Sequence, residues 1–568
     1  MNLSETARQQ IREASPLLLL LVGRMTIYLL FETGSSWSGI AVYVRLLFSL
    51  LMFYFIACFI HRVAAALSVL LIEMLLIQAN HVKVSATGVP IVASDIAGLD
   101  RSLSLVSGYV TPGIQITVVA LAIIVFLGWR YRRRSWREFF GNLPLGLLLP
   151  LLVGMLAFSN GMAAGMVRNG LCRIQICHVA WRPLVNVAMN GLPAQLVMTS
   201  EAVAVPERGP HSFYEERRSG LLTANQPDVL LILCESCFTT FDQRFRTPMF
   251  QFVDQGFTPF TLLSPVYGGN TAEAEFETLT GLSSAVLPGI EYQNFAERFR
   301  SDSETLVKRF ADSGYATISL HNYFGGFWSR DRVYPRFGFQ ESIFLEDMGW
   351  ESASDHRLPP DKILFDRALD RYENAAADQK MFMYLITMFT HGDYADQGGD
   401  HGRGDYLRRM NQSMGELAAF LVQMEGAAQR RKRPLAIVVF GDHKPALSRV
   451  LFDVKVFPPA LFGASDLQDS SFELDWDPAP EQWKIRSQAT AFVRLADPEA
   501  SQALADRLDD LPMFCLPAEL ASLTPGNDDA FWEGVNAICH QPKDSLVRYR
   551  GDLWQQEFPL EIYAERLF

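Results

Sequence analysis

The chain has 568 residues, of which 49% are hydrophobic, and its formal net charge is −12. This length predicts two or three folded units. The acidic balance argues against a general nucleic-acid-binding protein, because such proteins neutralise phosphates with a positive surface. The 7 cysteines are too few for a disulfide scaffold, although Cys172/Cys177 and Cys515/Cys539 could each pair in an oxidising compartment.

Apolar stretches in the first 160 residues predict an α-helical membrane domain with five spans. The stretches cover roughly residues 16–32, 41–60, 63–80, 114–129 and 143–159. A cleaved signal peptide is the alternative for the first stretch, but no small-residue cleavage site follows it. The basic loop 130–137 is expected in the cytoplasm by the positive-inside rule. The loop 81–113 and everything after residue 160 are then extracytoplasmic.

Residues 161–227 are expected to connect the membrane domain to a soluble domain that covers 228–568. The apolar part of the connector, around 181–189, is expected either on the membrane surface or packed against the soluble domain. The soluble domain alternates short β-rich runs with helical segments, which predicts an α/β fold with a central, mostly parallel sheet flanked by helices. The predicted strands are 229–234, 316–320, 382–388 and 435–440.

Reactive side chains follow each of these predicted strands. Glu235 follows the first strand, His321 the second, His391 the third, and Asp442 with His443 the last. In open α/β sheets, ligands bind beyond the carboxyl ends of the strands. Carboxylates and neutral imidazoles are ligands for a divalent cation, so the sequence predicts a metal site at these strand ends. A single strand-end acid is more often a helix cap, but adjacent Asp442 and His443 after a glycine favour a ligand pair.

Thr271 stands where a glycine turn runs into a predicted helix. One interpretation makes its hydroxyl an N-cap, with Glu273, Glu275 and Glu277 favouring the positive end of the helix dipole. The other makes it a nucleophile ionised by a metal, while the N–H groups of the helix start hold a phosphate. The neighbouring metal motifs favour the nucleophile.

The segment 321–332 is aromatic and glycine-rich and contains Trp328 and Arg330. The planar guanidinium of an arginine suits bidentate contact with phosphate, and the tryptophan could form a wall of the site. Alternatively, Arg330, Asp331 and Arg332 are a charge cluster on the surface.

The motifs around Glu235, Thr271, Arg330, His391 and Asp442-His443 resemble the lipoteichoic acid synthase and phosphoglycerol transferase branch of the alkaline phosphatase and sulfatase superfamily. The resemblance implies five spans followed by an extracytoplasmic, alkaline-phosphatase-like domain. It implies one divalent ion, with Mn²⁺ favoured and Zn²⁺ or Mg²⁺ as alternatives, bound by Glu235, Thr271, Asp442 and His443. The implied head-group pocket consists of His321, Trp328, Arg330 and His391.

Three features depart from this family or match it loosely. Cys234 and Cys237 flank Glu235-Ser236; we interpret them as a core cysteine and a helix-start cysteine, with an altered metal site as the alternative. The segment 391–393 replaces an aromatic-proline continuation, which affects the expected shape of the pocket. The loop 83–95 is loosely similar to an outer loop of phosphoglycerol transferases that act on periplasmic glucans.

The resemblance implies a phosphoglycerol transferase of the bacterial inner membrane, with its catalytic domain on the periplasmic side. It would move glycerol phosphate from phosphatidylglycerol to a hydroxyl of an envelope glycan or polymer through a covalent phospho-threonine at Thr271. His391 and Arg330 are the other expected catalytic residues, and His321 is a second candidate acid/base. The alternatives are a phosphoethanolamine transferase and a non-catalytic head-group-binding regulator of envelope assembly. A sulfatase is disfavoured because Thr271 lacks a Cys-x-Pro-x-Arg type context.

Overall fold

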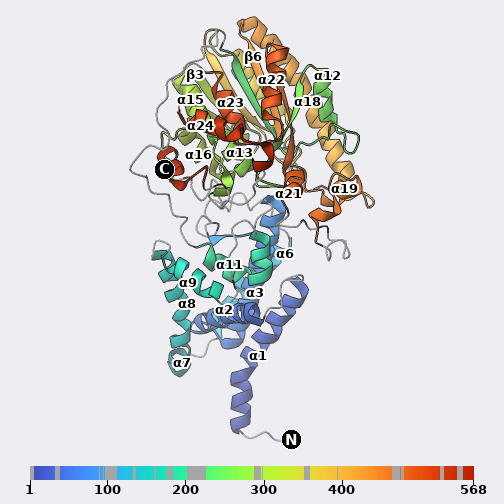
Figure 1. Cartoon of the computed structure of the whole chain (residues 1–568). Coiled ribbons are helices and arrows are strands. Elements are labelled where there is room, and N and C mark those ends of the chain that lie inside the picture. Colours follow the sequence, from blue (N-terminus) through green and yellow to red (C-terminus); the bar gives the residue numbers. More distant parts are fainter. Residues whose placement is uncertain are drawn as a thin grey trace. The chain divides into compact units, whose positions relative to one another are not determined.

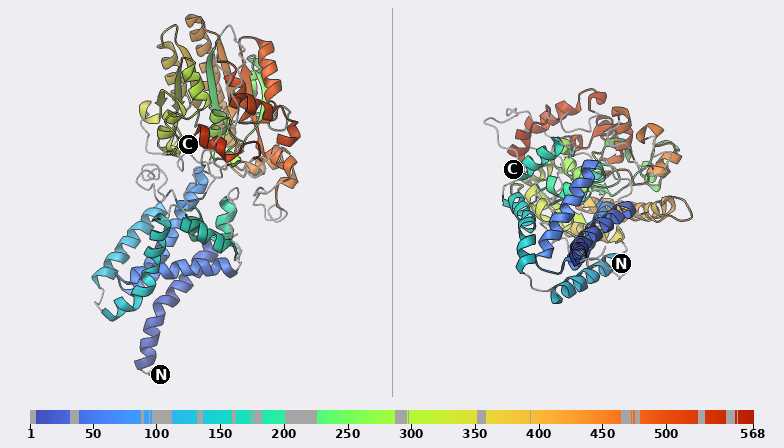
Figure 2. Two further views of the ribbon diagram at one scale, coloured as in Figure 1. Left: turned by 60° about the vertical axis from the view of Figure 1, so that its left-hand side comes forward. Right: turned by 90° about the horizontal axis from the view of Figure 1, so that it is seen from below.

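The chain forms two compact units, Met1–Ala204 and Val205–Phe568, which we describe separately. Figures 1 and 2 show the helices of the first unit and the sheet and helices of the second. The computed structural model describes residues 5–31, 39–87, 90–93, 95, 112–131, 136–158, 162–173, 176, 183–200, 226–286, 296, 298–350, 358–392, 394–463, 472, 474, 479–524, 530–546, 554 and 556–568.

The named secondary-structure elements in the described part of the first unit are all helices (Figure 1). Its helices are α1 (Glu5–Phe31), α2 (Gly39–Ala57), α3 (Arg62–Thr87), α6 (Pro112–Arg130), α7 (Trp136–Gly146), α8 (Leu148–Phe158), α9 (Met162–Arg173), α10 (Pro183–Asn190) and α11 (Leu192–Met198). The prediction of an N-terminal region with apolar helices is therefore confirmed.

Two helical segments, Arg62–Val84 and Pro112–Arg130, are long and apolar enough to cross a membrane. Three shorter apolar segments, Ala14–Leu29, Val42–Ala57 and Phe139–Gly154, overlap the other predicted spans, 16–32, 41–60 and 143–159. The predicted fifth span is divided between α7 and α8, and Pro144 lies inside α7. The loop predicted from residue 81 begins only after Thr87, because α3 continues to that residue. The full count of five spans remains a prediction.

Buried polar contacts link three helices of the first unit. Nε of Arg24 on α1 lies 3.0 Å from Oε2 of Glu73 on α3. Ser49 on α2 donates a hydrogen bond to the same carboxylate. Charged groups inside apolar helix bundles are costly unless they are paired, so this ion pair constrains how α1 and α3 pack. In the connector, Ala194 and Met198 of α11 pack with Val44 of α2.

The second unit is built on an eight-stranded sheet with the strand order β4-β3-β5-β1-β6-β7-β2-β8. The five strands from β4 to β6 are parallel, whereas β7 is antiparallel to both β6 and β2. The strands are β1 (Asp228–Cys234), β2 (Thr258–Leu263), β3 (Tyr315–His321), β4 (Glu341–Ile343), β5 (Lys380–Ile386), β6 (Leu435–Gly441), β7 (Gln488–Arg494) and β8 (Leu511–Pro512). The predicted mostly parallel sheet is confirmed.

All four predicted strands are present, but the predicted strand 382–388 lies two residues earlier, as β5. Strands β2, β4, β7 and β8 were not predicted from the sequence. Every residue of β1 is buried, which agrees with a central strand covered on both faces.

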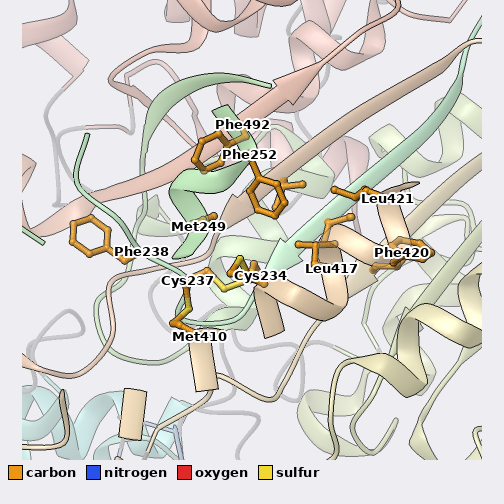
Figure 3. Close-up of a cluster of buried hydrophobic side chains, with 14 of the residues drawn as sticks. Cys234, Cys237, Phe238, Met249, Phe252, Met410, Leu417, Phe420, Leu421 and Phe492 are labelled. Atoms are coloured by element: carbon orange, nitrogen blue, oxygen red, sulfur yellow. A yellow bond between two sulfur atoms is a disulfide. The ribbon is translucent and has the colours of Figure 1, made fainter. Parts of the chain in front are cut away.

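Helices cover both faces of this sheet. Leu230 and Ile232 of β1 pack in one buried cluster with α17 (Lys362–Glu373) and α18 (Arg403–Arg431). Figure 3 shows part of this cluster, with Leu417, Phe420 and Leu421 of α18. On the other face, Phe310 of α15 (Leu306–Asp312) stacks on Phe382 of β5, with ring centroids 4.4 Å apart.

Candidate active site

The carboxyl ends of the central strands are level with one another. The strand register pairs Cys234 of β1 with Gly441 of β6, and His321 of β3 with Ile386 of β5. Residues that directly follow these strands therefore lie along one edge of the sheet, as the sequence predicted.

Glu235, Asp442 and His443 come together at this edge. One ligand atom from each lies within 4.8 Å of the others, and all three residues are buried. Nε2 of His443 is 3.1 Å from Oδ2 of Asp442 and 3.6 Å from Oε1 of Glu235. Nδ1 of His443 is 3.0 Å from the carbonyl oxygen of Lys444. We assign the proton to Nδ1, which donates to that carbonyl, so Nε2 presents its lone pair to the two carboxylates.

The chemistry of this group fits a divalent cation. Oδ2 of Asp442 and Nε2 of His443 are buried and have no hydrogen-bond partner in the described part of the chain. Burial and the neighbouring Glu235 carboxylate raise the pKa of Asp442, and burial lowers the pKa of His443. Two adjacent carboxylates and a neutral imidazole repel one another through their lone pairs, and a bound cation would remove that repulsion.

Thr271 is directed at the same group. Helix α13 (Thr271–Thr280) begins at Thr271, and its N-cap position is Asn270. Oγ1 of Thr271 donates a hydrogen bond to Oε2 of Glu235 at 2.8 Å. The interpretation of Thr271 as the N-cap is therefore wrong, because its hydroxyl binds a candidate metal ligand instead of the helix backbone.

Non-glycine residues with left-handed backbone conformations lie directly beside Glu235, Thr271 and Arg330 in the chain. Ser236 has φ 53° and Asn270 has φ 66°, directly after Glu235 and directly before Thr271. Trp328 and Ser329 have φ 58° and 56°, directly before Arg330. Such conformations cost of order 1–3 kcal/mol each and are typical of sites where the surrounding structure fixes the backbone.

The two histidines predicted to line the pocket have different surroundings. His321 is buried, and its Nδ1 is 3.0 Å from the carbonyl oxygen of Ile386. Burial and the nearby Arg330 charge lower the pKa of His321 well below its usual range, so its imidazole is neutral. His391 is only half-buried, and its carbonyl accepts a hydrogen bond from Arg409 at 2.7 Å.

Arg330 is buried in an ion pair with Glu275 of α13. Its Nε lies 3.1 Å from Oε1 of Glu275, and Tyr334 donates a hydrogen bond to the other carboxylate oxygen. The alternative of a surface charge cluster is therefore wrong for Arg330. Trp328 is 5% exposed and packs edge-on against Phe327. From the sequence, Glu275 was expected only to favour the positive end of the helix dipole, and its pairing with Arg330 was not predicted.

The loop after β1 holds a disulfide that the sequence analysis did not predict. Cys234 and Cys237 are bonded to each other, so their interpretation as separate core and helix-start cysteines is wrong. The Cys515–Cys539 pairing, which the sequence left open, is present as a disulfide. Cys177 lies outside the described residues, so the possible Cys172/Cys177 pairing stays open.

Two further contacts join this loop to its neighbours and were missed in the sequence. The amide of Ser236 donates to Oδ1 of Asp442 at 2.8 Å. The amide of Glu235 donates to Oγ1 of Thr387 at 3.0 Å. A Cβ atom at Gly441 would lie 2.0 Å from the carbonyl oxygen of Cys237, so only glycine fits there. The loops after β1 and β6 are therefore in direct backbone contact.

Comparison with known proteins shows which family this part of the chain is similar to. Residues 227–482 match the family model described as Sulfatase. The "Putative cyclic beta-1,2-glucan modification protein" of Rhizobium meliloti is 26% identical over 371 residues, which are 60% of this chain and 55% of that protein. The capsular polysaccharide biosynthesis protein RkpI of the same organism is 27% identical over 197 residues, 33% of this chain and 34% of that protein. The chain thus spans about half or less of the length of the curated relatives it matches.

Two solved structures illustrate the structural neighbours. The phosphoglycerol transferase GacH of Streptococcus pyogenes has 17% identity and a TM-score of 0.40 over 61% of this chain and 91% of that chain. The lipooligosaccharide phosphoethanolamine transferase EptA of Neisseria meningitidis has 12% identity and a TM-score of 0.46 over 89% of this chain and 95% of that chain. Residues 227–482 are therefore similar to the Sulfatase family, and Glu235, Asp442 and His443, the buried candidate metal ligands, lie within this matched segment.

Proposed function

We propose that this protein is a membrane-anchored phosphoglycerol transferase that moves glycerol phosphate from phosphatidylglycerol to a hydroxyl of an envelope glycan. The observation that carries the proposal is the hydrogen bond from Thr271 to Glu235, beside Asp442 and His443. It places a hydroxyl at a group of side chains suited to a divalent cation. A cation bound there by Glu235, Asp442, His443 and Thr271 would lower the pKa of the hydroxyl and neutralise charge on phosphoryl oxygens.

The transfer takes two steps on Thr271. Oγ1 of Thr271 loses its proton and bonds to the phosphorus of the lipid, while the phosphorus–oxygen bond to diacylglycerol breaks. Diacylglycerol leaves as an alcohol after it takes up a proton, which balances the proton that Oγ1 loses, and the glycerophosphoryl group stays on Thr271. The acceptor hydroxyl then bonds to the same phosphorus, the bond to Oγ1 breaks, and Thr271 regains its proton.

We assign the proton transfers at the leaving and attacking oxygens to His391. A general acid must reach the reacting oxygens and carry a proton near neutral pH. His321 is buried and held neutral, whereas His391 is half-buried and follows β5 at the same edge of the sheet as Glu235. His321, Trp328 and Arg330 are then assigned to binding the head group.

The apolar helices and the disulfides support the membrane and compartment parts of the proposal. A lipid donor meets a membrane-anchored enzyme at high effective concentration, and two helices are long and apolar enough for spans. Disulfides such as Cys234–Cys237 and Cys515–Cys539 persist in oxidising compartments such as the periplasm. We therefore propose the periplasmic side of the inner membrane for the catalytic domain.

The names of the curated relatives support a glycan acceptor. One relative is named for modification of cyclic β-1,2-glucan and another for capsular polysaccharide biosynthesis. Both names refer to carbohydrates, which offer many hydroxyl groups as acceptors.

The donor is tested with phosphatidylglycerol and phosphatidylethanolamine, each labelled in the head group. The full-length protein is incubated with Mn²⁺ and one lipid, denatured, and measured for covalent label. We expect label from phosphatidylglycerol on the wild type and on Thr271→Ser, which keeps a hydroxyl, and none on Thr271→Ala. Label from phosphatidylethanolamine alone would establish the phosphoethanolamine alternative. Label from neither lipid would favour the head-group-binding regulator, and label retained on Thr271→Ala would refute the assigned nucleophile.

A further inference from the structure

A disulfide closes the loop that follows β1. Cys234 and Cys237 are bonded across a sequence separation of 3, with their Cα atoms 5.3 Å apart. Both cysteines are fully buried. Figure 3 shows the bridge beside Phe238, Met249 and Met410, in the buried cluster on the α18 side of the sheet. The bridge thus joins the end of the central strand to the start of the next segment.

The two residues enclosed by this bridge both act at the candidate metal centre. Glu235 is one of the three candidate ligands. Ser236 donates from its amide to Oδ1 of Asp442 at 2.8 Å and from its hydroxyl to Oε1 of Glu235 at 2.9 Å. The ring closed by this disulfide therefore contains the ligand Glu235. It also contains Ser236, whose hydrogen bonds orient the carboxylates of Glu235 and Asp442.

Ser236 can make these contacts only in an uncommon backbone conformation. Its φ of 53° lies in the left-handed region, which a non-glycine residue adopts at a cost. Outside the ring, the carbonyl of Ser236 accepts one hydrogen bond from Tyr406 at 3.0 Å. A covalent link between the flanking residues removes most alternative conformations of the two enclosed residues, because it fixes both ends of a very short loop.

The second described disulfide provides a contrast. Cys515–Cys539 joins α23 (Cys515–Ala521) to α24 (Ala530–Cys539) across a separation of 24. Neither cysteine adjoins a candidate ligand or a predicted pocket residue. In the loop-closure account, the longer loop gives the larger gain in stability, so this bridge should matter more for stability than Cys234–Cys237.

We propose that the Cys234–Cys237 disulfide is a positioning element of the metal centre. It holds the Glu235 carboxylate and the Ser236 amide in the geometry that binds the cation, and its loss weakens metal binding while the sheet stays folded. The inference rests on the proposed function only in assuming that Glu235, Asp442 and His443 bind a divalent cation. Loss of contacts that orient metal ligands typically costs about 10–100-fold in metal affinity.

The test compares two double variants of the full-length protein, Cys234→Ala/Cys237→Ala and the matched control Cys515→Ala/Cys539→Ala. Mn²⁺ affinity is measured by the electron paramagnetic resonance signal of free Mn²⁺, and Tm is measured on the same samples without added metal. We expect Cys234→Ala/Cys237→Ala to weaken Mn²⁺ binding about 10–100-fold, as for other lost orienting contacts. The control should bind Mn²⁺ as the wild type does but lose more in Tm. Cys234→Ala/Cys237→Ala is therefore expected to lose more Mn²⁺ affinity, and Cys515→Ala/Cys539→Ala is expected to lose more in Tm.

Transfer activity separates positioning from general damage. With the bridge removed, we expect the Mn²⁺ concentration for half-maximal activity to rise by the same factor as the Kd, while activity at saturating Mn²⁺ stays near that of the wild type. A purely stabilising bridge would lower Tm and leave both metal measurements unchanged, and that result would overturn the inference.

A second measurement covers the case in which Cys234→Ala/Cys237→Ala does not fold. The control variant is reduced under native conditions with dithiothreitol, which becomes a cyclic disulfide as both cysteines become thiols. After the reductant is removed without oxygen, Mn²⁺ binding is measured, and alkylation with peptide mass analysis identifies the reduced cysteines. If alkylation shows that Cys234 and Cys237 were reduced and the Mn²⁺ affinity of the reduced protein is unchanged, the inference is also overturned. Absence of Mn²⁺ binding to the wild type would instead contradict the metal centre of the proposed function.

Discussion

Arg330 and Glu275 form an ion pair in which the side chains are only 2% and 0% exposed. Tyr334 donates to the same carboxylate, so three side chains from α13 and α16 (Arg330–Phe337) share one buried contact. The arginine that we assign to the head group is therefore fixed in place before any substrate binds.

Removing one partner of this pair should destabilise the protein more than removing both. Arg330→Met leaves the Glu275 charge buried and unpaired, which typically costs about 3–5 kcal/mol. Arg330→Met/Glu275→Leu should cost less, because no unpaired charge remains. The check is a double-mutant cycle on thermal unfolding of the full chain in detergent.

The exposed pair Arg449–Asp453, with Nε and Oδ2 2.9 Å apart, is the control for this cycle. Arg449→Met should change stability by less than about 1 kcal/mol, as for other surface ion pairs. Equal losses of stability for Arg330→Met and Arg449→Met would show that the buried pair stabilises the protein no more than a surface pair does.

Asp442→Asn should weaken metal binding strongly, because it removes a charged ligand and keeps the side-chain volume. Changes to residues that hydrogen-bond to metal ligands typically lower metal affinity by about 10–100-fold. We expect Asp442→Asn to lower Mn²⁺ affinity by at least this factor. Titration with Mn²⁺ measures the loss. Asp506→Asn, on an exposed aspartate of α22 (Pro498–Leu508), should bind Mn²⁺ as tightly as the wild type.

Metal removal should lower the thermal stability of the wild type. A cation at 100 times its Kd stabilises the folded state by about 2.7 kcal/mol if it does not bind the unfolded chain. We expect EDTA to lower Tm, excess Mn²⁺ to restore it, and Asp442→Asn to respond to neither. A wild-type Tm that is the same with EDTA and with Mn²⁺ would argue against a cation in this group.

Glu277 should make stability depend on pH. Burial raises the pKa of Glu277 from 4.5 to about 8. Between these values the folded state keeps a proton that the unfolded chain loses, so stability is full below about pH 4.5 and falls as pH rises toward 8. The slope is at most about 1.4 kcal/mol per pH unit for one proton.

Glu277→Gln removes this titration and keeps an acceptor for the amide of Ser284, 3.0 Å from Oε1 of Glu277. We therefore expect Tm between pH 5 and pH 8 to fall less steeply in Glu277→Gln than in the wild type. Glu499→Gln, on an exposed carboxylate, is the control and should keep the wild-type slope. Parallel curves for the wild type and Glu277→Gln would contradict the assignment.

The sequence predicted the central strands and the metal-ligand candidates for related reasons. Buried parallel strands appear as continuous apolar runs, and the residues that follow them must meet at one edge of the sheet. The strands that were missed lack such runs. β2 contains Pro259, β7 mixes Gln488 and Thr490 with apolar residues, and β4 and β8 are only 3 and 2 residues long.

The contacts that were missed depend on geometry that local sequence does not carry. Arg330 and Glu275 are 55 residues apart, and nothing near either residue indicates its partner. Whether Cys234 and Cys237 can bond depends on the separation of their Cα atoms, which the left-handed Ser236 between them helps to set. Thr271 could be interpreted as a cap until the direction of its hydroxyl was known.

The close approach of Gly441 to Cys237 limits how this site can be redesigned. The carbonyl of Cys237 fills the space that a side chain at 441 would need, so position 441 accepts only glycine while the backbone at Cys237 keeps its path. Changing the metal preference of the protein would therefore have to leave Gly441 in place and vary the ligand positions around it. A library that varied position 441 would mostly sample variants in which the two loops no longer fit.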